Sequence, residues 1–169
     1  MVENIFAPWR LEYVAAVDAR DRSECVFCQA FSSADDRETL TLWRRGRSFA
    51  ILNLYPYTTG HCMVVPNIHC ADFALLDEET IAEMMLGARE LTNVLRRLYN
   101  PHGFNIGINV GEAAGAGIEE HLHLHVVPRW RADNNMMAVV GETRVIPEDL
   151  GTTFERMREI VSGSDGGYE

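Results

Sequence analysis

Three of the six histidines in this 169-residue chain alternate with leucines, at positions 121, 123 and 125. Alternate side chains of a β-strand lie on one face, so these imidazoles are predicted to point the same way while the leucines point into the core. Packing alone does not explain such a face, because imidazole is a poor core filler and protonated rings repel one another. Two chemistries use it: neutral imidazoles can bind a metal, or one imidazole can attack as a nucleophile while its neighbours orient it and transfer protons.

Two of the four cysteines, Cys25 and Cys28, have the Cys-x-x-Cys spacing that brings both thiolates to one metal ion. Two inert buried cysteines are the alternative, and a redox pair is disfavoured because no strand-then-helix pattern surrounds the motif. Cys62 and Cys70 have apolar neighbours and are expected to be buried small residues. Without an export signal ahead of the motif, we expect a cytoplasmic protein that lacks disulfides.

The elements that must position these groups begin with a helix predicted over 77–100, where apolar residues recur at steps of three and four. Acidic residues favour its first turn and arginines its last, and Asn-Pro-His-Gly ends it. Apolar or alternating segments predict strands, at 47–54, 62–66, 104–110 and 121–128. Strands around one long helix, with few parallel crossovers available, favour an α+β fold in which the helix packs on an antiparallel sheet.

The length predicts one domain. Residues 1–24 are expected to form an N-terminal arm, and 25–161 a single domain with a C-terminal extension. The segment 162–169 has no core former and is expected to be disordered. The turn at 55–61 and the glycine-rich loop at 111–117 separate the predicted strands.

Composition excludes several classes of function. The formal net charge of −10 disfavours a nucleic-acid or anionic-membrane binder, and no apolar run approaches the length of a membrane helix. All 15 basic residues are arginine. A mechanism that needs a lysine, such as a P-loop or a Schiff base, is therefore excluded.

The segment HLHLHVV (121–127) resembles the His-x-His-x-His-x-x motif of the histidine triad (HIT) family of nucleotide hydrolases and transferases. CVFC (25–28), NLYPYTTGHCMVVPNIH (53–69) and FNIGINVG (104–111) are similar to HIT segments and occur in the family's order. The resemblance covers about residues 25–130 and implies a HIT-like fold. PWRLEY (8–13) and PRWRADNNMMAVVGETRVIP (128–147) are similar to the longer branch that includes diadenosine tetraphosphate phosphorylases.

The resemblance implies roles for individual residues. His123 matches the histidine that attacks the α-phosphorus of a nucleotide, His125 the one that contacts the α-phosphate, and His61 a fourth histidine behind the triad that includes His121. Asn53 matches the residue that binds the ribose hydroxyls. Further nucleotide contacts are expected from an adenine pocket (Ile51, Leu54) and a phosphate-side loop (Asn109, Gly111).

The chain departs from familiar hydrolases just before the triad, where they carry Gln or Ser against the bridging oxygen. Here the segment 115–120 offers no such side chain, and the backbone N–H groups of Gly115 and Gly117 are expected to hold phosphate oxygens instead. This difference favours phosphorolysis, in which inorganic phosphate resolves the intermediate, over hydrolysis. Arg129 could contact a long polyphosphate or belong to a solvated surface pair, and Trp130 could stack on a base or close a dimer.

Zinc-bearing relatives complete their metal site with a histidine after the second core strand and the first triad histidine. Those positions are His69 and His121, so the resemblance implies a structural Zn²⁺ held by them with Cys25 and Cys28. HIT proteins also dimerise through the long helix and an edge strand, and a homodimer is therefore expected.

The leading hypothesis is an enzyme that cleaves a dinucleoside polyphosphate at the α-phosphate, with phosphate or water as the acceptor. A nucleoside phosphoramidate hydrolase of the same family is an alternative. A third possibility is a zinc hydrolase in which all three triad histidines hold the metal, which leaves the two cysteines unexplained. A non-catalytic, zinc-containing nucleotide-binding module is disfavoured, because binding alone needs no nucleophile.

Overall fold

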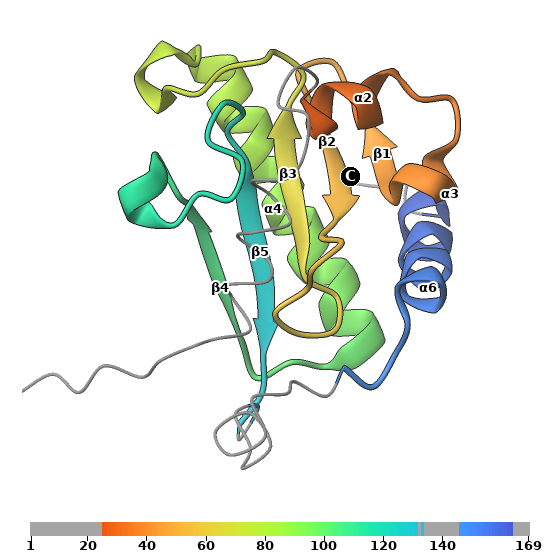
Figure 1. Ribbon diagram of the computed structural model, residues 1–169. Coiled ribbons are helices and arrows are strands. Elements are labelled where there is room, and N and C mark those ends of the chain that lie inside the picture. The colour runs from red at the N-terminus through yellow and green to blue at the C-terminus, as the bar shows by residue number, and fades with distance from the viewer. Residues whose placement is uncertain (1–24, 132, 134–145, 164–169) are drawn as a thin grey trace, which may run out of the picture.

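The computed structural model describes residues 25–131, 133 and 146–163 (Figure 1). The predicted arm at 1–24 therefore lies outside the described residues, as does most of the segment 128–147 that resembles the longer branch. Among the described residues, no helix combines the length and the apolar character needed to span a membrane.

A five-stranded antiparallel sheet forms the centre of the described chain, as the sequence predicts. The strands follow the spatial order β1-β2-β3-β5-β4 (Figure 1). Their bounds are Thr41–Arg44 (β1), Ser48–Leu52 (β2), Cys62–Pro66 (β3), Gly103–Ile108 (β4) and Leu124–Arg129 (β5). β1 is an element that the sequence analysis missed, and β4 forms one edge of the sheet.

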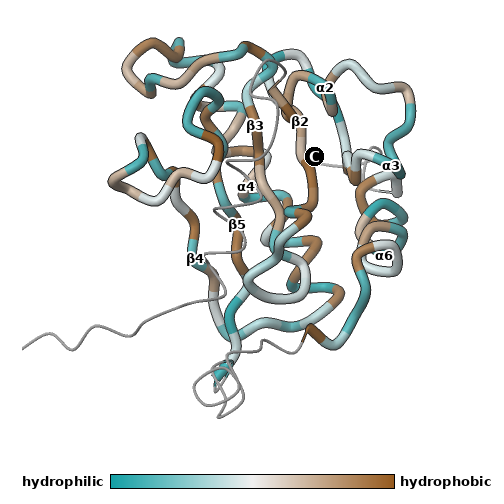
Figure 2. Tube along the Cα trace, viewed as in Figure 1, coloured by the Kyte–Doolittle hydropathy of each residue, from teal (hydrophilic) through white to brown (hydrophobic). Residues whose placement is uncertain are grey.

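Both faces of β2 and β3 are buried, which explains why these strands are continuous apolar runs (Figure 2). Alternate residues enter different cores: Ala50 and Val64 belong to the larger cluster, Phe49 and Val65 to the smaller one. The larger core lies under helices α4 and α6, and the smaller one under helix α2. The smaller core also contains Phe27, which lies between the two cysteines of the Cys-x-x-Cys motif.

The long helix α4 (Glu78–Tyr99) confirms the predicted helix at 77–100 and packs across β3 and β5, behind the sheet in Figure 1. Asp77 is its N-cap, and its side chain accepts a hydrogen bond from the Thr80 N–H at 2.8 Å. Asn100 closes the other end in the left-handed region, with φ at 45°. The apolar periodicity of the segment and its capping residues were therefore sufficient to place this helix.

Several short or terminal elements were not predicted. They are the helices α2 (Val26–Ser32), α3 (Asp36–Thr39) and α6 (Leu150–Gly163), and the 3-10 turns η1 (Phe73–Leu75) and η2 (Glu112–Ala114). The disordered tail was expected to start at residue 162, but Ser162 and Gly163 belong to the last turn of α6. The helix forms because its apolar face packs on α4 and β1, with Met157 completely buried.

Two further expectations are corrected. The predicted strand at 121–128 begins only at Leu124, so His121 and His123 precede β5 and only His125 lies on it. Cys62 is fully buried as expected, but Cys70 is only partly buried and contacts the Asp72 carbonyl oxygen at 3.2 Å.

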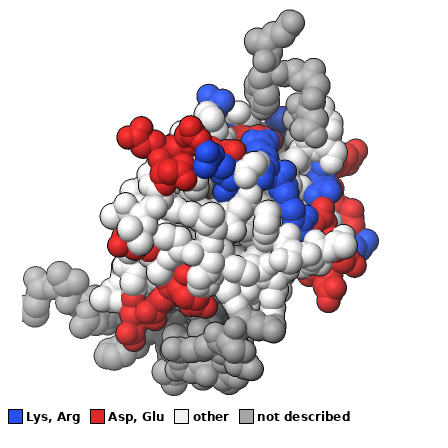
Figure 3. Space-filling model, turned by 90° about the horizontal axis from the view of Figure 1, so that it is seen from above, with Lys and Arg blue, Asp and Glu red and all other residues white. Residues whose placement is uncertain are grey.

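Arginine charge is largely paired with acidic side chains. Seven arginines form ion pairs in the described part of the chain: Arg37, Arg44, Arg45, Arg47, Arg129, Arg156 and Arg158. The face seen in Figure 3 accordingly shows basic groups flanked by acidic ones and a broad uncharged area.

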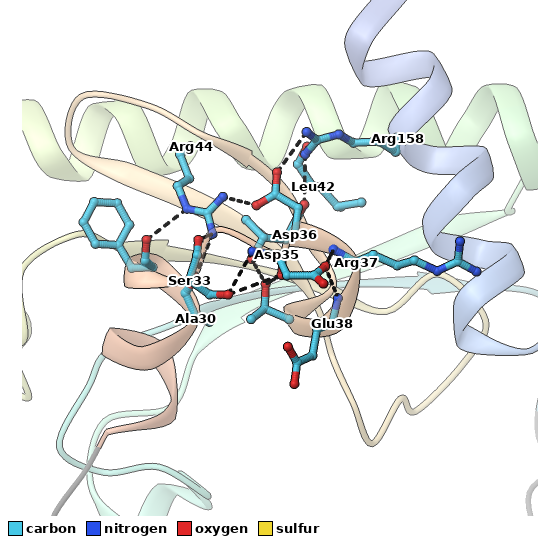
Figure 4. Close-up of polar contacts among 12 residues, drawn as sticks. Ala30, Ser33, Asp35, Asp36, Arg37, Glu38, Leu42, Arg44 and Arg158 are labelled. Carbon is cyan, nitrogen blue, oxygen red and sulfur yellow. Dashed lines mark hydrogen bonds and ion pairs between the residues drawn. The ribbon is translucent and has the colours of Figure 1, made fainter.

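Arg44 holds the carboxyl end of α2, and Arg158 is joined to it through Asp36 (Figure 4). Arg44 donates to the carbonyl oxygens of Ala30 at 2.7 Å and Phe31 at 3.0 Å, which the last turn of a short helix leaves without partners. Asp36 lies between Arg44 and Arg158, and Arg158 also donates to the Leu42 carbonyl of β1 at 2.7 Å. The network joins α2 and α3 to β1 and α6.

Candidate active site

Four histidines gather where the chain enters β5 and β3. His121 and His123 are 1% and 4% exposed, and the ring centroids of His123 and His125 are 4.8 Å apart. His61 joins them from the residue before β3, 5.1 Å from His125 between centroids. Gly60 makes this placement possible, because its φ is 79° and a Cβ there would lie 2.6 Å from Leu95. The structure therefore brings together all four predicted histidines.

The hydrogen bond of His123 determines its tautomer. Its Nδ1 lies 2.9 Å from the His121 carbonyl oxygen, which can only accept a hydrogen bond. Nδ1 therefore carries the proton, and the Nε2 lone pair is available. An imidazole held in this way is prepared for nucleophilic attack without a separate base.

A chain of hydrogen bonds determines the tautomers of His61 and His125. The Tyr57 backbone N–H donates to His61 Nδ1 at 3.1 Å, so His61 carries its proton on Nε2. That nitrogen lies 3.0 Å from His125 Nδ1 and donates to it. The remaining proton of His125 is then on Nε2, where it can donate to an oxygen of a substrate.

Burial keeps these imidazoles neutral. Desolvation, followed by the charge of His125, lowers the pKa of His61 to about 3. Desolvation, followed by the charge of His123, lowers the pKa of His125 to about 4. The pKa of His123 is also lowered, chiefly by burial, although its hydrogen bond to His121 opposes the shift. Neutral His123 is the form that can attack phosphorus at neutral pH.

The low pKa of His61 predicts a pH-dependent stability. As the pH falls below about 6.5, the ordinary pKa of histidine, residue 61 becomes protonated in the unfolded chain. In the folded chain it stays neutral until about pH 3. Protonation therefore stabilises the unfolded state, and the free energy of unfolding decreases. One such group contributes about 1.4 kcal/mol per pH unit. We expect His61→Gln to flatten the dependence between about pH 4.5 and 6 by up to that amount in urea unfolding. Release of a metal at low pH affects the wild type and His61→Gln alike, so it cancels in the difference between their free energies of unfolding. Parallel pH profiles of these free energies would contradict the prediction.

A second cluster adjoins the triad through His121. The sulfur and imidazole nitrogen atoms of Cys25, Cys28, His69 and His121 all lie within 4.8 Å of one another. His121 Nδ1 is 3.2 Å from Cys25 Sγ and 3.7 Å from Cys28 Sγ, and His69 Nδ1 is 3.4 Å from Cys28 Sγ. Neighbouring ligands of a tetrahedral Zn²⁺ are separated by about 3.3–3.8 Å. The separations of 3.4 and 3.7 Å fall within this range, and the 3.2 Å separation is slightly shorter.

The tautomer of His121 also fits a metal ligand. Its Nε2 lies 2.9 Å from the Pro66 carbonyl oxygen and therefore carries the proton, which leaves the Nδ1 lone pair facing the two sulfur atoms. Burial and the neighbouring Cys25 raise the pKa of the Cys28 thiol, so a metal must displace a proton there. The cluster includes neither His123 nor His125. A single metal held by all three triad histidines is therefore not the arrangement found.

The predicted ribose-binding residue lies beside the histidines. The amide nitrogen of Asn53 is 3.3 Å from His61 Nδ1, and its Oδ1 accepts from the Tyr55 N–H at 2.9 Å. Of the two predicted adenine-pocket residues, Ile51 is 8% exposed on β2 and Leu54 is 53% exposed. Of the two residues predicted to contact adenine, one is therefore buried in the sheet and the other lies at the surface.

The predicted phosphate-side loop lies between β4 and β5. The Asn109 side chain donates to the Gly115 carbonyl oxygen at 3.5 Å, which ties the start of the loop to its middle. Gly111 and Gly115 have φ values of 80° and 85°, a region that favours glycine. Gly117 lies in the partly buried stretch 116–118, a few residues before His121. The loop is therefore held by the conformations that its glycines allow.

Arg129 and Trp130 lie at the opposite end of β5 from the triad (Figure 1). Arg129 lies four positions after His125, about 13 Å along an extended strand. Arg129 forms an ion pair with Asp133 at 2.6 Å and donates to Asn105 at 2.8 Å, while Trp130 Nε1 donates to the Tyr99 carbonyl at 3.3 Å. Within one chain, therefore, neither Arg129 nor Trp130 reaches the triad. The ion pair of Arg129 with Asp133 matches the surface pair considered for it rather than a contact with polyphosphate.

Two aromatic side chains that contact the histidines were not predicted from the sequence. The Phe27 ring lies 5.0 Å from His123, and the Tyr57 ring lies 4.6 Å from His61. Phe27 lies inside the Cys-x-x-Cys motif, and Tyr57 lies four residues before His61. Both are therefore close in sequence to predicted site residues, but neither belongs to a periodic pattern that would predict a contact with a histidine. Only the packing of α2 and of the 55–61 turn onto the sheet reveals these contacts.

Fold and site together define an α+β protein in which four buried or partly buried histidines adjoin a Cys₂His₂ cluster that shares His121 with them. The HIT domain family model matches residues 36–132, and the chain belongs to the HIT family, as an enzyme of that family. The family resemblance found in the sequence is thereby confirmed.

Three relatives illustrate the similarity. The chain is 36% identical over 157 residues to the AP-4-A phosphorylase of Mycobacterium tuberculosis, covering 90% of this chain and 80% of that protein. A Zn-bound histidine triad family protein from Mycobacterium smegmatis superposes with a TM-score of 0.69 and 28% identity, over 84% of this chain and 96% of that one. A hypothetical histidine triad nucleotide-binding protein from Sulfolobus tokodaii shares the fold, with a TM-score of 0.67 and 24% identity over 86% and 100%.

Proposed function

We propose that this protein cleaves a dinucleoside polyphosphate at its α-phosphate through a nucleotide bound covalently to His123. The observation that carries the proposal is the available Nε2 lone pair of a neutral, buried His123 whose Nδ1 proton is held by the His121 carbonyl. The 36% identity to an AP-4-A phosphorylase supports a polyphosphate with two adenosines as the substrate.

The reaction proceeds in two displacements. His123 Nε2 attacks the α-phosphorus, an N–P bond forms, and the P–O bond to the leaving polyphosphate breaks with its electron pair going to that oxygen. His125 Nε2–H donates to an oxygen of the reacting phosphate and stabilises the developing charge. An incoming oxygen then attacks the same phosphorus, and the N–P electron pair returns to His123.

Inorganic phosphate is the proposed acceptor in the second displacement. The segment 115–120 carries no Gln or Ser to orient a water molecule, whereas its glycines leave backbone N–H groups for phosphate oxygens. Hydrolysis, including hydrolysis of a nucleoside phosphoramidate, remains the second candidate because the first displacement is the same.

Products distinguish the alternatives. Diadenosine tetraphosphate radiolabelled in adenine is incubated with the protein, with and without phosphate. ADP and ATP that appear only with phosphate support phosphorolysis. AMP and ATP in either condition indicate hydrolysis, and the absence of products, with nucleotide binding retained, indicates a binding module.

We further propose that the Cys₂His₂ cluster holds a structural Zn²⁺. The donor set and the separations among Cys25, Cys28, His69 and His121 support this, as does the similarity to a Zn-bound relative. Zn²⁺ at this site would join α2 to the loop after β3 and to the start of the triad segment.

Cys25→Ser is expected to lower zinc content and melting temperature together, because it removes one of four ligands from a site that joins three segments. Elemental analysis and calorimetry measure the two effects. The proposal is wrong if protein purified without chelator contains no zinc, or if the variant retains a full equivalent.

A homodimer is proposed through α4 and β4. β4 is an edge strand with Ile106 44% exposed, and Met85 and Leu86 of α4 are about half exposed. Light scattering at micromolar concentration should give twice the chain mass of 19.1 kDa. Ile106→Glu should shift the mass toward that of one chain, and a wild-type monomer would remove the proposal.

The proposed partners are small nucleotides and phosphate in the cytoplasm rather than nucleic acid or a membrane. The formal charge of −10 and the paired arginines support this assignment, because a nucleic acid or an anionic membrane needs an extended surface of unpaired basic groups.

A further inference from the structure

Phe27 links the metal cluster to the nucleophile. It lies between the two cysteines of the cluster and is 3% exposed. Its ring meets His121 edge-on at 5.4 Å between centroids and lies against His123 at 5.0 Å. One side chain on α2 therefore contacts both a cluster residue and the nucleophile.

The backbone supplies a second link between the same residues. The carbonyl oxygen that holds the Nδ1 proton of His123 belongs to His121, whose side chain is part of the cluster. Any displacement of His121 moves the acceptor that determines the tautomer of His123. The ring of His123 is thus bounded on one side by Phe27 and anchored at one nitrogen by His121.

The two ends of α2 are held differently. Arg44 binds carbonyl oxygens at its carboxyl end. At its amino end, Cys25 is the N-cap but makes no side-chain capping hydrogen bond, and the first turn contains no acidic residue. A seven-residue helix is marginal by itself, so the amino end that carries Phe27 depends on the contacts of Cys25 and Cys28.

We infer that Phe27 is a positioning residue, through which the occupied Cys₂His₂ cluster holds the His123 ring in the orientation that directs Nε2 at phosphorus. This inference rests on the proposed function and adds a role for the cluster beyond folding. Rotation of an imidazole about its Cβ–Cγ bond exchanges Nδ1 for carbon, so a ring that is not held spends time with Nε2 misdirected. Displacements of about 1 Å at a reacting group cost as much as 10²-fold in rate.

The test compares two leucine substitutions on the same helix. Phe27→Leu keeps an apolar side chain but removes the flat ring against His123. Phe31→Leu is the matched control, because Phe31 lies one turn further along α2 and packs on Phe49, at 5.5 Å, rather than on a histidine. Each protein is prepared with zinc, and its metal content is measured.

Two readouts are taken. The first is the ¹⁵N NMR spectrum of the histidine rings without nucleotide. The wild type with zinc should show His123 as one Nδ1–H tautomer, whereas Phe27→Leu with full zinc, and the wild type after zinc removal, should show a mixture. The second readout is the rate of nucleotide transfer to His123 in a single turnover at saturating diadenosine tetraphosphate. This rate is expected to fall about 10- to 100-fold in Phe27→Leu and less than about 2-fold in Phe31→Leu.

Each outcome decides the inference. A single Nδ1–H tautomer of His123 together with a wild-type transfer rate in Phe27→Leu would overturn the inference. Equal losses of transfer rate in Phe27→Leu and Phe31→Leu would also overturn it, as would a loss of zinc from Phe27→Leu that accounts for its slower rate. If the wild type transfers no nucleotide at all, the proposed function fails, and the NMR comparison still decides whether Phe27 and the cluster hold the His123 ring.

Discussion

His123→Ala is expected to lower turnover of the dinucleoside polyphosphate by at least about 10⁴-fold, as for other enzymes deprived of their nucleophile. The substitution removes the Nε2 lone pair that forms the bond to phosphorus, and no other imidazole takes its place. His125 Nδ1 accepts from His61, and both nitrogens of His121 are engaged by Pro66 and the cysteines. Steady-state and single-turnover rates measure the loss.

Nucleotide affinity should survive this substitution, because the binding contacts are assigned to Asn53, Ile51 and the loop before the triad. His102→Ala is the matched control, since that histidine is exposed and accepts a hydrogen bond from the Arg131 N–H at the Arg129 end of β5, away from the triad. Added imidazole is expected to restore part of the activity of His123→Gly. A phosphoramidate-linked nucleotide trapped on the wild type and mapped to a residue other than His123 would refute the mechanism.

His125→Ala is expected to reduce the rate by roughly 10²–10³-fold, which is the usual value of one donor to a developing oxyanion. The loss is smaller than for His123 because the bond-forming atom remains. His61 would also lose the acceptor for its Nε2–H in a buried site, so part of the cost should appear as reduced stability. Turnover and urea unfolding together separate the two effects.

His125→Gln, whose amide keeps an N–H donor, should recover part of the rate lost in His125→Ala. Zinc content should be unchanged in both, because His125 is not in the metal cluster. Loss of zinc, or a rate as low as that of His123→Ala, would instead favour a metal held by the triad histidines.

The local pattern of the sequence was sufficient for the elements that carry a periodic signal. The helix at 77–100 has an apolar stripe and capping residues at both ends, and the strand at 62–66 has the bounds that were predicted. α2, β1 and α6 carry weaker signals. α2 and β1 are short, and side chains from other elements hold their backbones. Arg44 of β1 binds the Ala30 carbonyl 14 residues away, and Arg158 of α6 binds the Leu42 carbonyl 116 residues away.

The sequence alone determined which residues could do chemistry: alternating histidines after a glycine-rich loop, and a cysteine pair far from them along the chain. Only the tertiary structure decided how the work is divided among identical imidazoles. His121 turns a lone pair to the cysteines because the Pro66 carbonyl accepts its proton, and His123 keeps Nε2 available because the His121 carbonyl accepts from Nδ1. His125 becomes a donor because His61 and the Tyr57 N–H orient the chain of protons. A histidine's role depends on which atom lies opposite each ring nitrogen, and most of those atoms come from segments that meet only when β3 and β5 pair.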